Sequence, residues 1–258
     1  DLKDPVWSGY TCFAAIANCV PDDIKDVGYK VFLGSRKYFV SVDVGGGRIQ
    51  WYAFLNLPPN SLSLKDGEES ISFLRDEFKG WSPEVEQLLG STALDQIEQR
   101  DLFDRAPEFK CAHPSIPLIP LPHPTPAPTP NPPRTPLFLT RWADGHVCLL
   151  GDAVHPMQPT LGQGGGMAIE DAWVLSRLLE RWEDQPASGL EEYERYRLPR
   201  TARVQARSRA QGEEFHLSER RAVWTRNFKL ALGSRYLPEI AMKQFDWLHG
   251  YDCVRGFE

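Results

Sequence analysis

One stretch of the sequence, residues 147–172, brings together residue types that bind anionic ligands. It contains Gly151 followed by Asp152, and then Pro159. A glycine lets the backbone turn and approach a ligand closely, and a carboxylate at the end of a strand is a common ligand-facing group. A glycine cluster follows: Gly162, Gly164, Gly165 and Gly166. Backbone N–H groups at a glycine-led helix start can bind an anion, so this stretch predicts a ligand site.

The residues on either side of the turn predict a strand before it and a helix after it. Residues 147–150 form a short apolar run, which is typical of a buried parallel strand. Farther along, apolar side chains recur at helical spacing: Ile169, Ala172, Trp173, Leu175, Leu178, Leu179 and Trp182. The glycines alone also fit a simple strand-to-helix connection with no ligand. The complete order of strand, turn, loop and helix is what indicates a binding site.

The composition indicates a globular chain and narrows the classes of ligand. The 258 residues are 41% hydrophobic and 25% charged, enough for one large domain or parts of two. A net charge of −6 gives no reason to expect nucleic acid, and no apolar run approaches the length of a membrane span. The N-terminal residues resemble neither a signal peptide nor a transit peptide. The five cysteines are scattered, so neither a disulfide framework nor a zinc site is expected and no metal is assigned.

The first hundred residues predict an antiparallel sheet with two helices packed on it. Apolar residues alternate in strand fashion over residues 10–54, and the three glycines at 45–47 supply a hairpin turn. A first helix is predicted around residues 71–78, ending at Gly80, and Ser82 is the expected N-cap of a second. We expect both helices to pack on the sheet rather than to bind a ligand.

Residues 113–136 differ from the rest of the chain because 11 of these 24 residues are proline. Such a segment forms neither a helix nor a central strand, so we expect an extended polyproline-type excursion or an irregular loop. An inert insertion is the favoured interpretation. A ligand for a proline-recognising module and an incorrectly spliced gene are the alternatives.

The last seventy residues predict helices with an aromatic tail. Residues 190–215 fit a long polar helix broken near Pro199, and a further helix is expected over 220–232. Six arginines lie along the first of these: Arg195, Arg197, Arg200, Arg203, Arg207 and Arg209. We favour a solvated helix face for them over contact with cofactor phosphates or an acidic electron donor. The tail is expected to pack on the domain rather than touch a lipid surface, through Phe245, Trp247, Leu248, Tyr251 and Phe257.

Residues 151–172 resemble the motif that closes the FAD site in flavoprotein monooxygenases related to p-hydroxybenzoate hydroxylase. The family pattern is Gly-Asp-Ala-x-His-x-x-x-Pro-x-x-Gly-Gln-Gly-x-x-x-Ala-Ile-Glu-Asp-Ala, and every fixed position is filled here. The resemblance implies that Asp152 hydrogen-bonds the ribityl chain of FAD and that the loop over 159–166 lies along the isoalloxazine ring. The positive end of the following helix would favour the reduced flavin anion. The implied cofactor-binding residues are Gly151, Asp152, Pro159, Gly162, Gln163, Gly164, Gly165, Gly166 and Met167.

The N-terminal half narrows the resemblance to the zeaxanthin epoxidases of plants and algae. Segments within residues 8–54 look like the substrate-domain sheet of those enzymes, and the match covers roughly residues 7–110 and 137–200. The flavin loop agrees, because zeaxanthin epoxidases have a small residue at the position of Gly166 followed by methionine, as Met167 is here. Most other relatives have asparagine in place of that small residue.

This resemblance implies an FAD-dependent monooxygenase that epoxidises the β-ring double bond of zeaxanthin to give antheraxanthin and then violaxanthin. Reduced FAD would react with molecular oxygen to form a C4a-hydroperoxide, with electrons from NADPH or reduced ferredoxin. The site must exclude water, but no side chain is named as a catalytic acid or base. The family implies a chloroplast location, and a membrane-dissolved substrate leaves room for a peripheral membrane contact. The implied substrate-binding residues form an apolar wall: Tyr38, Val40, Gln50, Tyr52 and Phe54.

The implied fold is mixed α+β and α/β. It combines an antiparallel substrate-domain sheet and helices with the C-terminal strand-loop-helix part of a p-hydroxybenzoate hydroxylase-type FAD-binding fold, truncated at its N-terminus. The expected domains are the sheet at 1–112, the proline-rich insertion or linker at 113–136, and the C-terminal FAD-binding part at 137–258. The family's Gly-x-Gly-x-x-Gly βαβ unit is not among these residues, so we expect this chain alone neither to retain FAD nor to turn over. Two alternatives stay open: a flavin hydroxylase of salicylate-like aromatic acids, and a non-catalytic remnant that keeps the fold.

Overall fold

The computed structural model describes residues 6–24, 28–62, 64, 66–104, 142–236, 239, 243 and 245–255. The chain divides into two compact units. The first, here called the sheet unit, comprises Trp7–Phe103 and Ala210–Asp246. The second, here called the helix unit, comprises Asp1–Val6, Asp104–Arg209 and Trp247–Glu258. The proline-rich segment 113–136 and Phe257 lie outside the described residues, so the expectations for them stay predictions.

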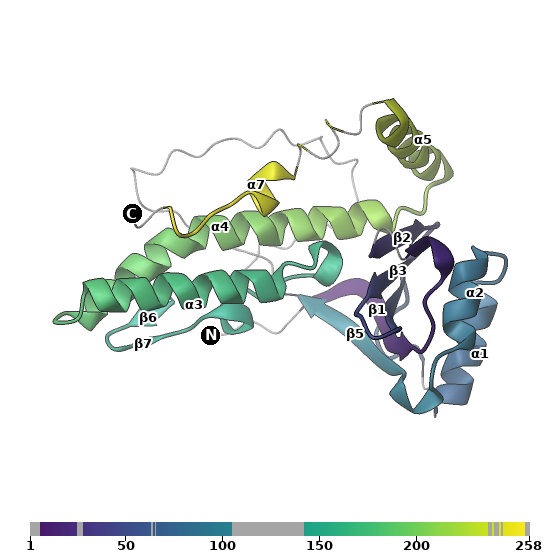
Figure 1. Ribbon diagram of the computed structural model, residues 1–258, viewed down its shortest axis with the longest axis horizontal. Coiled ribbons are helices and arrows are strands. Elements are labelled where there is room, and N and C mark those ends of the chain that lie inside the picture. Colours follow the sequence, from purple (N-terminus) through teal and green to yellow (C-terminus); the bar gives the residue numbers. More distant parts are fainter. Residues whose placement is uncertain are drawn as a thin grey trace. The chain divides into compact units, whose positions relative to one another are not determined.

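The sheet unit is built on five strands in the order β2-β3-β4-β1-β5 (Figure 1). Their bounds are β1 Val6–Ala17, β2 Tyr29–Leu33, β3 Lys37–Asp43, β4 Ile49–Leu55 and β5 Glu98–Asp104. Strands β3 and β4 form the predicted hairpin, with Tyr38 opposite Phe54. Its turn needs glycine because Gly45, Gly46 and Gly47 all have positive φ, at 78°, 64° and 73°.

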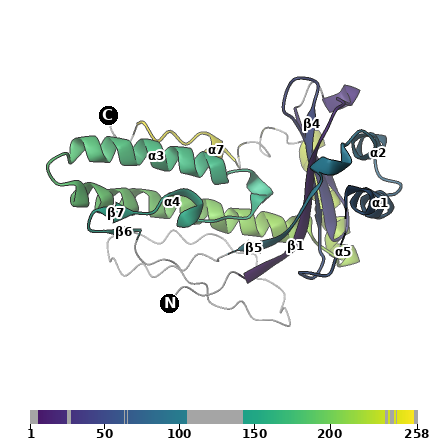
Figure 2. The same cartoon turned by 90° about the horizontal axis from the view of Figure 1, so that it is seen from below.

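One face of the sheet is covered by two helices, α1 (Gly67–Glu77) and α2 (Pro83–Gly90) (Figure 2). Helix α2 begins as predicted, since the Ser82 side chain accepts the N–H of Glu84. The helices and this face share a hydrophobic core that includes Phe13, Phe39, Trp51, Leu74, Leu88 and others. The predicted packing of both helices on the sheet is therefore confirmed. Short 3-10 turns lie at Asp22–Ile24 and Leu94–Gln96.

Helix α5 (Arg220–Tyr236) completes the described secondary structure of the sheet unit and confirms the helix predicted there. The buried side chain of Arg226 anchors it. Its Nη2 donates to the carbonyl of Gly34 at 2.9 Å, and its Nη1 donates to the carbonyl of Phe215 at 3.0 Å. One guanidinium therefore joins α5, the end of the preceding helix and the sheet.

The helix unit contains a small hairpin and two long helices. The hairpin strands are β6 (Ala143–Asp144) and β7 (Val147–Cys148), and the long helices are α3 (Gly164–Arg181) and α4 (Pro186–Phe215), the last turns of which belong to the sheet unit. Short elements are the 3-10 turns Gly151–Ala153 and Pro159–Leu161 and helix α7 (Asp246–His249). The core of this unit consists of Trp142, Val154, Val174, Leu178 and Tyr193. No helix among the described residues is long and apolar enough to span a membrane.

Two expectations about these elements were wrong. Residues 147–150 are not a buried parallel strand: β7 pairs antiparallel with β6, and the side chain of Val147 is 68% exposed. The physical reason is the tight turn through Gly145, whose φ is +58°, which folds the chain back on the residues just before it. Helix α4 is not broken at Pro199 but continues through it. Contacts from both sides of the proline hold the helix together, as described below.

Candidate functional site

The Gly-Asp turn is held tightly against the start of helix α3. Gly151 has a φ of +59°, and a Cβ placed there would stand 3.3 Å from the Cβ of Ala168. Both the backbone conformation and the close approach therefore require glycine. The turn leaves the next residue, Asp152, exposed. Its Oδ1 lies 3.8 Å from where a Cβ of Gly164 would stand. The turn thus brings the carboxylate predicted from the sequence beside the first turn of α3.

The start of α3 presents backbone N–H groups that precede its hydrogen-bond ladder. Met167 is the residue whose N–H bonds to the carbonyl of Gln163, at 2.9 Å, so the N–H groups of Gly164, Gly165 and Gly166 come before the first helical bond. The N-cap residue, Gln163, makes no side-chain capping bond. Among the described residues, no atom beyond the adjacent residues and the helix's own backbone lies within 4 Å of where a Cβ of Gly165 would stand. This end of the helix is therefore open to a ligand that accepts hydrogen bonds.

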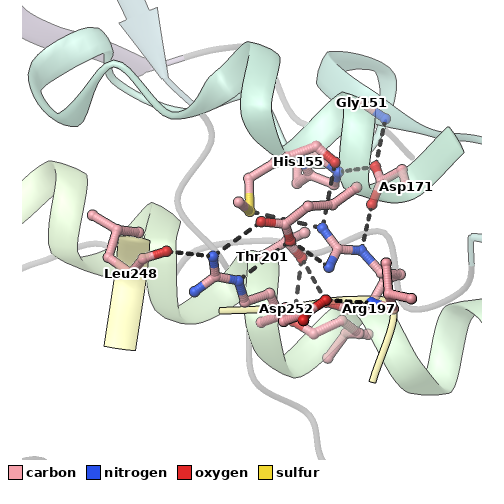
Figure 3. Close-up of polar contacts among 12 residues, drawn as sticks. Gly151, His155, Asp171, Arg197, Thr201, Leu248 and Asp252 are labelled. Atoms are coloured by element: carbon pink, nitrogen blue, oxygen red, sulfur yellow. Dashed lines mark hydrogen bonds and ion pairs between the residues drawn. The ribbon is translucent and has the colours of Figure 1, made fainter. Parts of the chain in front are cut away.

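The buried carboxylate of Asp171, on helix α3, holds the Gly-Asp turn in place (Figure 3). Its Oδ2 accepts the N–H of Gly151 at 3.0 Å and lies 2.5 Å from Nε2 of His155, while its Oδ1 accepts from Nε of Arg197 at 2.7 Å. Burial by itself would raise the pKa of Asp171, but the hydrogen bonds from His155, Arg197 and Gly151 outweigh burial and lower it. Asp171 is therefore ionised at neutral pH.

A second carboxylate, Glu170, extends the cluster to another arginine of α4. Glu170 pairs with Nη1 of Arg197 at 2.6 Å and with Nη2 of Arg200 at 3.0 Å. Arg200 also donates to the carbonyls of Trp247 and Leu248, at 3.0 and 2.9 Å. We call the group Glu170, Asp171, His155, Arg197 and Arg200 the anchor cluster.

The anchor cluster overturns the expected solvated face for two of the arginines. Arg197 is fully buried and Arg200 is 9% exposed, whereas Arg195 is exposed as expected. The reason is long-range pairing: the acids that neutralise both arginines are on α3, not on α4. The tail packs as expected, since the guanidinium of Arg200 lies 4.1 Å from the ring centroid of Tyr251. These contacts flank Pro199 and explain why α4 continues through it.

The loop between the turn and α3 is also tied to α4. Nε2 of Gln205 donates to the carbonyl of Pro156 at 2.6 Å, and the Thr160 hydroxyl donates to the carbonyl of Ser208. The sequence-predicted cofactor residues Gly151 to Gly166 therefore form one continuous, braced segment. Met167 is placed differently, because its side chain is fully buried and its Sδ lies 3.8 Å from Nη2 of Arg197.

The five predicted substrate-wall residues lie together on the sheet face opposite helices α1 and α2. Tyr38 pairs with Phe54, Val40 with Tyr52, and Val42 with Gln50, so all share one face of the β3–β4 hairpin. Tyr38, Val40 and Phe54 are buried, and the other two are half-buried. The face is apolar and aromatic, and the rings of Tyr38 and Phe54 stack with centroids 4.4 Å apart. Cys12 belongs to it as a protonated thiol, because burial raises its pKa to about 12.

A comparison with known protein families supports the FAD-binding prediction made from the motif. Residues 135–208 match the family described as FAD binding domain. This segment contains the Gly-Asp turn, the braced loop, α3 and the part of α4 that provides Arg197 and Arg200.

Curated proteins of similar sequence include chloroplastic zeaxanthin epoxidases. The chain is 39% identical over 216 residues to the chloroplastic zeaxanthin epoxidase of an Oncidium hybrid cultivar, covering 80% of this chain and 28% of that protein. It is 42% identical over 179 residues to the chloroplastic zeaxanthin epoxidase of Nicotiana plumbaginifolia, covering 69% of this chain and 22% of that protein. The chain spans less than a third of the length of these relatives.

Solved structures of similar fold include Klebsiella pneumoniae HpxO complexed with FAD and uric acid, at a TM-score of 0.71 and 23% identity, covering 95% of this chain and 54% of that chain. A salicylate hydroxylase substrate complex has a TM-score of 0.62 and 19% identity, covering 99% of this chain and 57% of that one. The predicted fold class is confirmed. Residues 135–208 match the FAD binding domain family, and the sequence is similar to that of chloroplastic zeaxanthin epoxidases.

Proposed function

We propose that this chain is part of an FAD-dependent monooxygenase that epoxidises the β-ring double bond of zeaxanthin, giving antheraxanthin and violaxanthin. The observation that supports this most strongly is the joined geometry of Asp152 and the open start of α3. A phosphate-bearing or electron-rich ligand fits such a site, and 39% identity to a zeaxanthin epoxidase narrows the choice.

The residues present fit FAD. The exposed Asp152 carboxylate would accept hydrogen bonds from ribityl hydroxyls. The amides of Gly164, Gly165 and Gly166 would donate to the ring edge where negative charge collects on reduction. Hydrogen bonds to charged groups contribute about 1.5–3 kcal/mol each, and the helix dipole about 0.3–1 kcal/mol. When bound, FAD supplies the redox chemistry that activates molecular oxygen.

The other cofactor-binding residues have supporting parts in this proposal. Gly151 provides the turn that presents Asp152, while Pro159, Gly162 and Gln163 shape the loop leading to the amides. The buried side chain of Met167 packs behind the site next to Arg197, so its contribution is to position the helix start.

The apolar sheet face suits a substrate that is mostly hydrocarbon. Tyr38, Val40, Tyr52 and Phe54 offer ring and aliphatic contacts, with Gln50 at one end of the wall. Apolar contacts of this kind leave little room for water beside the bound hydrocarbon, and oxygen transfer requires a site without water. Alkene epoxidation needs no base to deprotonate the substrate, and we assign no catalytic acid or base. Electrons from NADPH or reduced ferredoxin, a chloroplast location and peripheral contact with a membrane follow from the same proposal.

One observation favours a second candidate, a hydroxylase of salicylate-like acids. Such substrates need a cation for their carboxylate, and Arg100 lies on strand β5. Leu102, two residues along the strand, packs with the sheet face that holds the five substrate-wall residues, here called the aromatic wall. Arg100 therefore points to the same face. Arg100 is paired with Glu98, however, and 72% of its side chain is exposed. An exposed cation already paired with a carboxylate suits a second carboxylate poorly, so we prefer the epoxidase.

The test uses the full-length protein that contains this chain, reconstituted with FAD and supplied in turn with NADPH or with reduced ferredoxin. We expect oxygen-dependent conversion of zeaxanthin to its mono- and diepoxide, measured by chromatography, and no hydroxylation of salicylate. Turnover of salicylate without turnover of zeaxanthin would favour the second candidate. A protein that binds no flavin at all would be a non-catalytic remnant.

A further inference from the structure

We propose that the hydroxyl of Tyr38 and the imidazole of His216 form a polar recognition point for a hydroxyl group on an otherwise apolar, ring-containing substrate. The inference rests on the proposed function, because it adds a specificity contact to the aromatic wall. No motif in the sequence pointed to His216, which follows the last residue of α4. Every contact used below lies within the sheet unit.

Tyr38 presents a phenol oxygen that has no hydrogen-bond partner among the described residues. The residue is only 1% exposed. Its ring is fixed by Phe54, which stacks on it at 4.4 Å, and by Phe215, whose ring meets it edge-on at 5.0 Å. Burial raises the pKa of Tyr38 well above its usual value, so the phenol keeps its proton and remains a donor.

His216 presents a complementary acceptor. Its Nδ1 lies 2.9 Å from the carbonyl of Gly212, which has no proton to give, so Nδ1 is the protonated nitrogen. Its Nε2 therefore has a lone pair, and this buried atom has no partner among the described residues. Burial lowers the pKa of His216 to about 4, so the ring is neutral at physiological pH. The ring stacks on Tyr10 at 3.6 Å and meets Tyr38 edge-on at 5.0 Å.

The position of His216 is fixed by bonds on both sides of it. The N–H of Arg36 donates to the carbonyl of Leu217 at 3.1 Å. Arg226 donates to the carbonyls of Glu214 and Phe215, at 3.2 and 3.0 Å. Because these contacts hold the chain at residues 214–217 against the sheet, the imidazole is presented at a defined place on the aromatic wall.

The phenol donor and the imidazole acceptor, on rings whose centroids are 5.0 Å apart, complement the acceptor and donor of an alcohol. An alcohol oxygen can accept from the Tyr38 hydroxyl while its own proton is donated to Nε2 of His216. A carboxylate has no proton for Nε2, and a hydrocarbon satisfies neither atom. Buried polar groups are normally paired, so two orphans on neighbouring rings point to a ligand that supplies the missing partners. Each ring of zeaxanthin has one hydroxyl, whereas β-carotene has the same rings without it.

The experiment compares zeaxanthin with β-carotene as substrates of the full-length enzyme. Tyr38→Phe should lower kcat/KM for zeaxanthin about tenfold, the scale of one hydrogen bond, and leave kcat/KM for β-carotene unchanged. His216→Phe, which keeps a stacking ring, should act in the same direction. The control is Tyr236→Phe, which removes the hydroxyl of a residue on α5 that is 66% exposed. It should leave the ratio of kcat/KM for zeaxanthin to kcat/KM for β-carotene unchanged.

Three further outcomes decide the matter. A purely structural role for the Tyr38 hydroxyl would lower the melting temperature of Tyr38→Phe, whereas we expect it unchanged or raised because an unpaired buried group is removed. Equal loss of kcat/KM on both carotenoids, or no loss on zeaxanthin, would overturn the inference.

If the wild-type enzyme does not turn over zeaxanthin, the proposed function fails, and binding of 3-hydroxy-β-ionone and β-ionone then tests the contact alone. The alcohol should bind the wild type more tightly than the ketone lacking the hydroxyl, and Tyr38→Phe should abolish the difference. Equal affinities in the wild type would overturn the inference by this route as well.

Discussion

The Nε2 atom of His155 lies 2.5 Å from Oδ2 of Asp171, and the two side chains are 2% and 0% exposed. The same oxygen accepts the N–H of Gly151, so one carboxylate on α3 holds both ends of the turn that presents Asp152. We assign Asp171 no contact with a ligand. It positions the residues that contact one, which explains why the motif ends in an acidic pair.

Replacing Asp171 should therefore damage stability and cofactor binding together. Asp171→Asn leaves the buried guanidinium of Arg197 without one of its two carboxylates, and breaking a buried ion pair on one side costs about 3–5 kcal/mol. We expect a loss of that size in the free energy of unfolding, measured with urea. The control is Glu180→Gln, which removes an exposed partner of Arg177 and should change stability by less than about 1 kcal/mol. Equal effects of the two changes would show that the anchor cluster does not stabilise the fold.

Gly165→Ala should separate cofactor binding from folding. A methyl group at Gly165 meets no side chain and no other helix or strand of the described residues, and alanine is a better helix former than glycine by about 1 kcal/mol. We expect an unchanged or slightly raised melting temperature in the full-length protein, together with at least about a tenfold loss of FAD affinity because the methyl fills the ligand's place. Normal flavin content in this variant would mean that the cofactor does not approach the start of α3.

The stability of the sheet unit should depend on pH through His216. Burial lowers the folded-state pKa of this histidine from 6.5 to about 4; the hydrogen bond to Gly212 opposes the shift and the charge of Arg226 adds to it. Among the described residues, the other ionisable side chains whose rings contact it are Tyr10 and Tyr38. The unfolded chain thus binds a proton that the folded chain does not, and stability is lost as the pH falls from 6.5 to 4.

A comparison of wild type with His216→Phe isolates this contribution. Between pH 7 and pH 5 the wild type should lose about 2 kcal/mol more than the variant, since one pKa unit corresponds to about 1.4 kcal/mol. Urea denaturation at the two pH values measures the difference. Parallel losses in both proteins would contradict the assigned protonation of the ring.

Much of the fold was predictable from local sequence because it depends on neighbouring residues. The alternation in β3 and β4, the glycine turn between them and the Ser82 cap all specify structure over a few positions. The start of α3 was predictable for the same reason. The β3–β4 register follows from the turn, and it gathers Tyr38, Val40, Tyr52, Phe54 and Gln50 on one face as expected.

The parts that were missed depend on contacts between distant residues. Arg197 looks like a surface residue on a polar helix, and only the folded chain brings it to Asp171, 26 positions earlier. A clue was available, since α4 has many arginines while the motif before it ends in two acids with no local partner. Strand β5 and His216 gave no such clue, because their places depend on pairing with β1 and on stacking against Tyr10.

The most direct test of the central claim is the flavin content of full-length protein in which Asp152 is replaced by alanine. Asp152 is exposed, so the change should leave the melting temperature of the flavin-free protein unaltered. Asp144→Ala, on the exposed neighbouring hairpin, is the matched control and should retain the wild-type ratio of FAD to protein. We predict that Asp152→Ala lowers FAD affinity about tenfold or more, the scale of one charge-assisted hydrogen bond. Wild-type flavin occupancy and affinity in Asp152→Ala would contradict the assignment of this turn and the start of α3 as the FAD site.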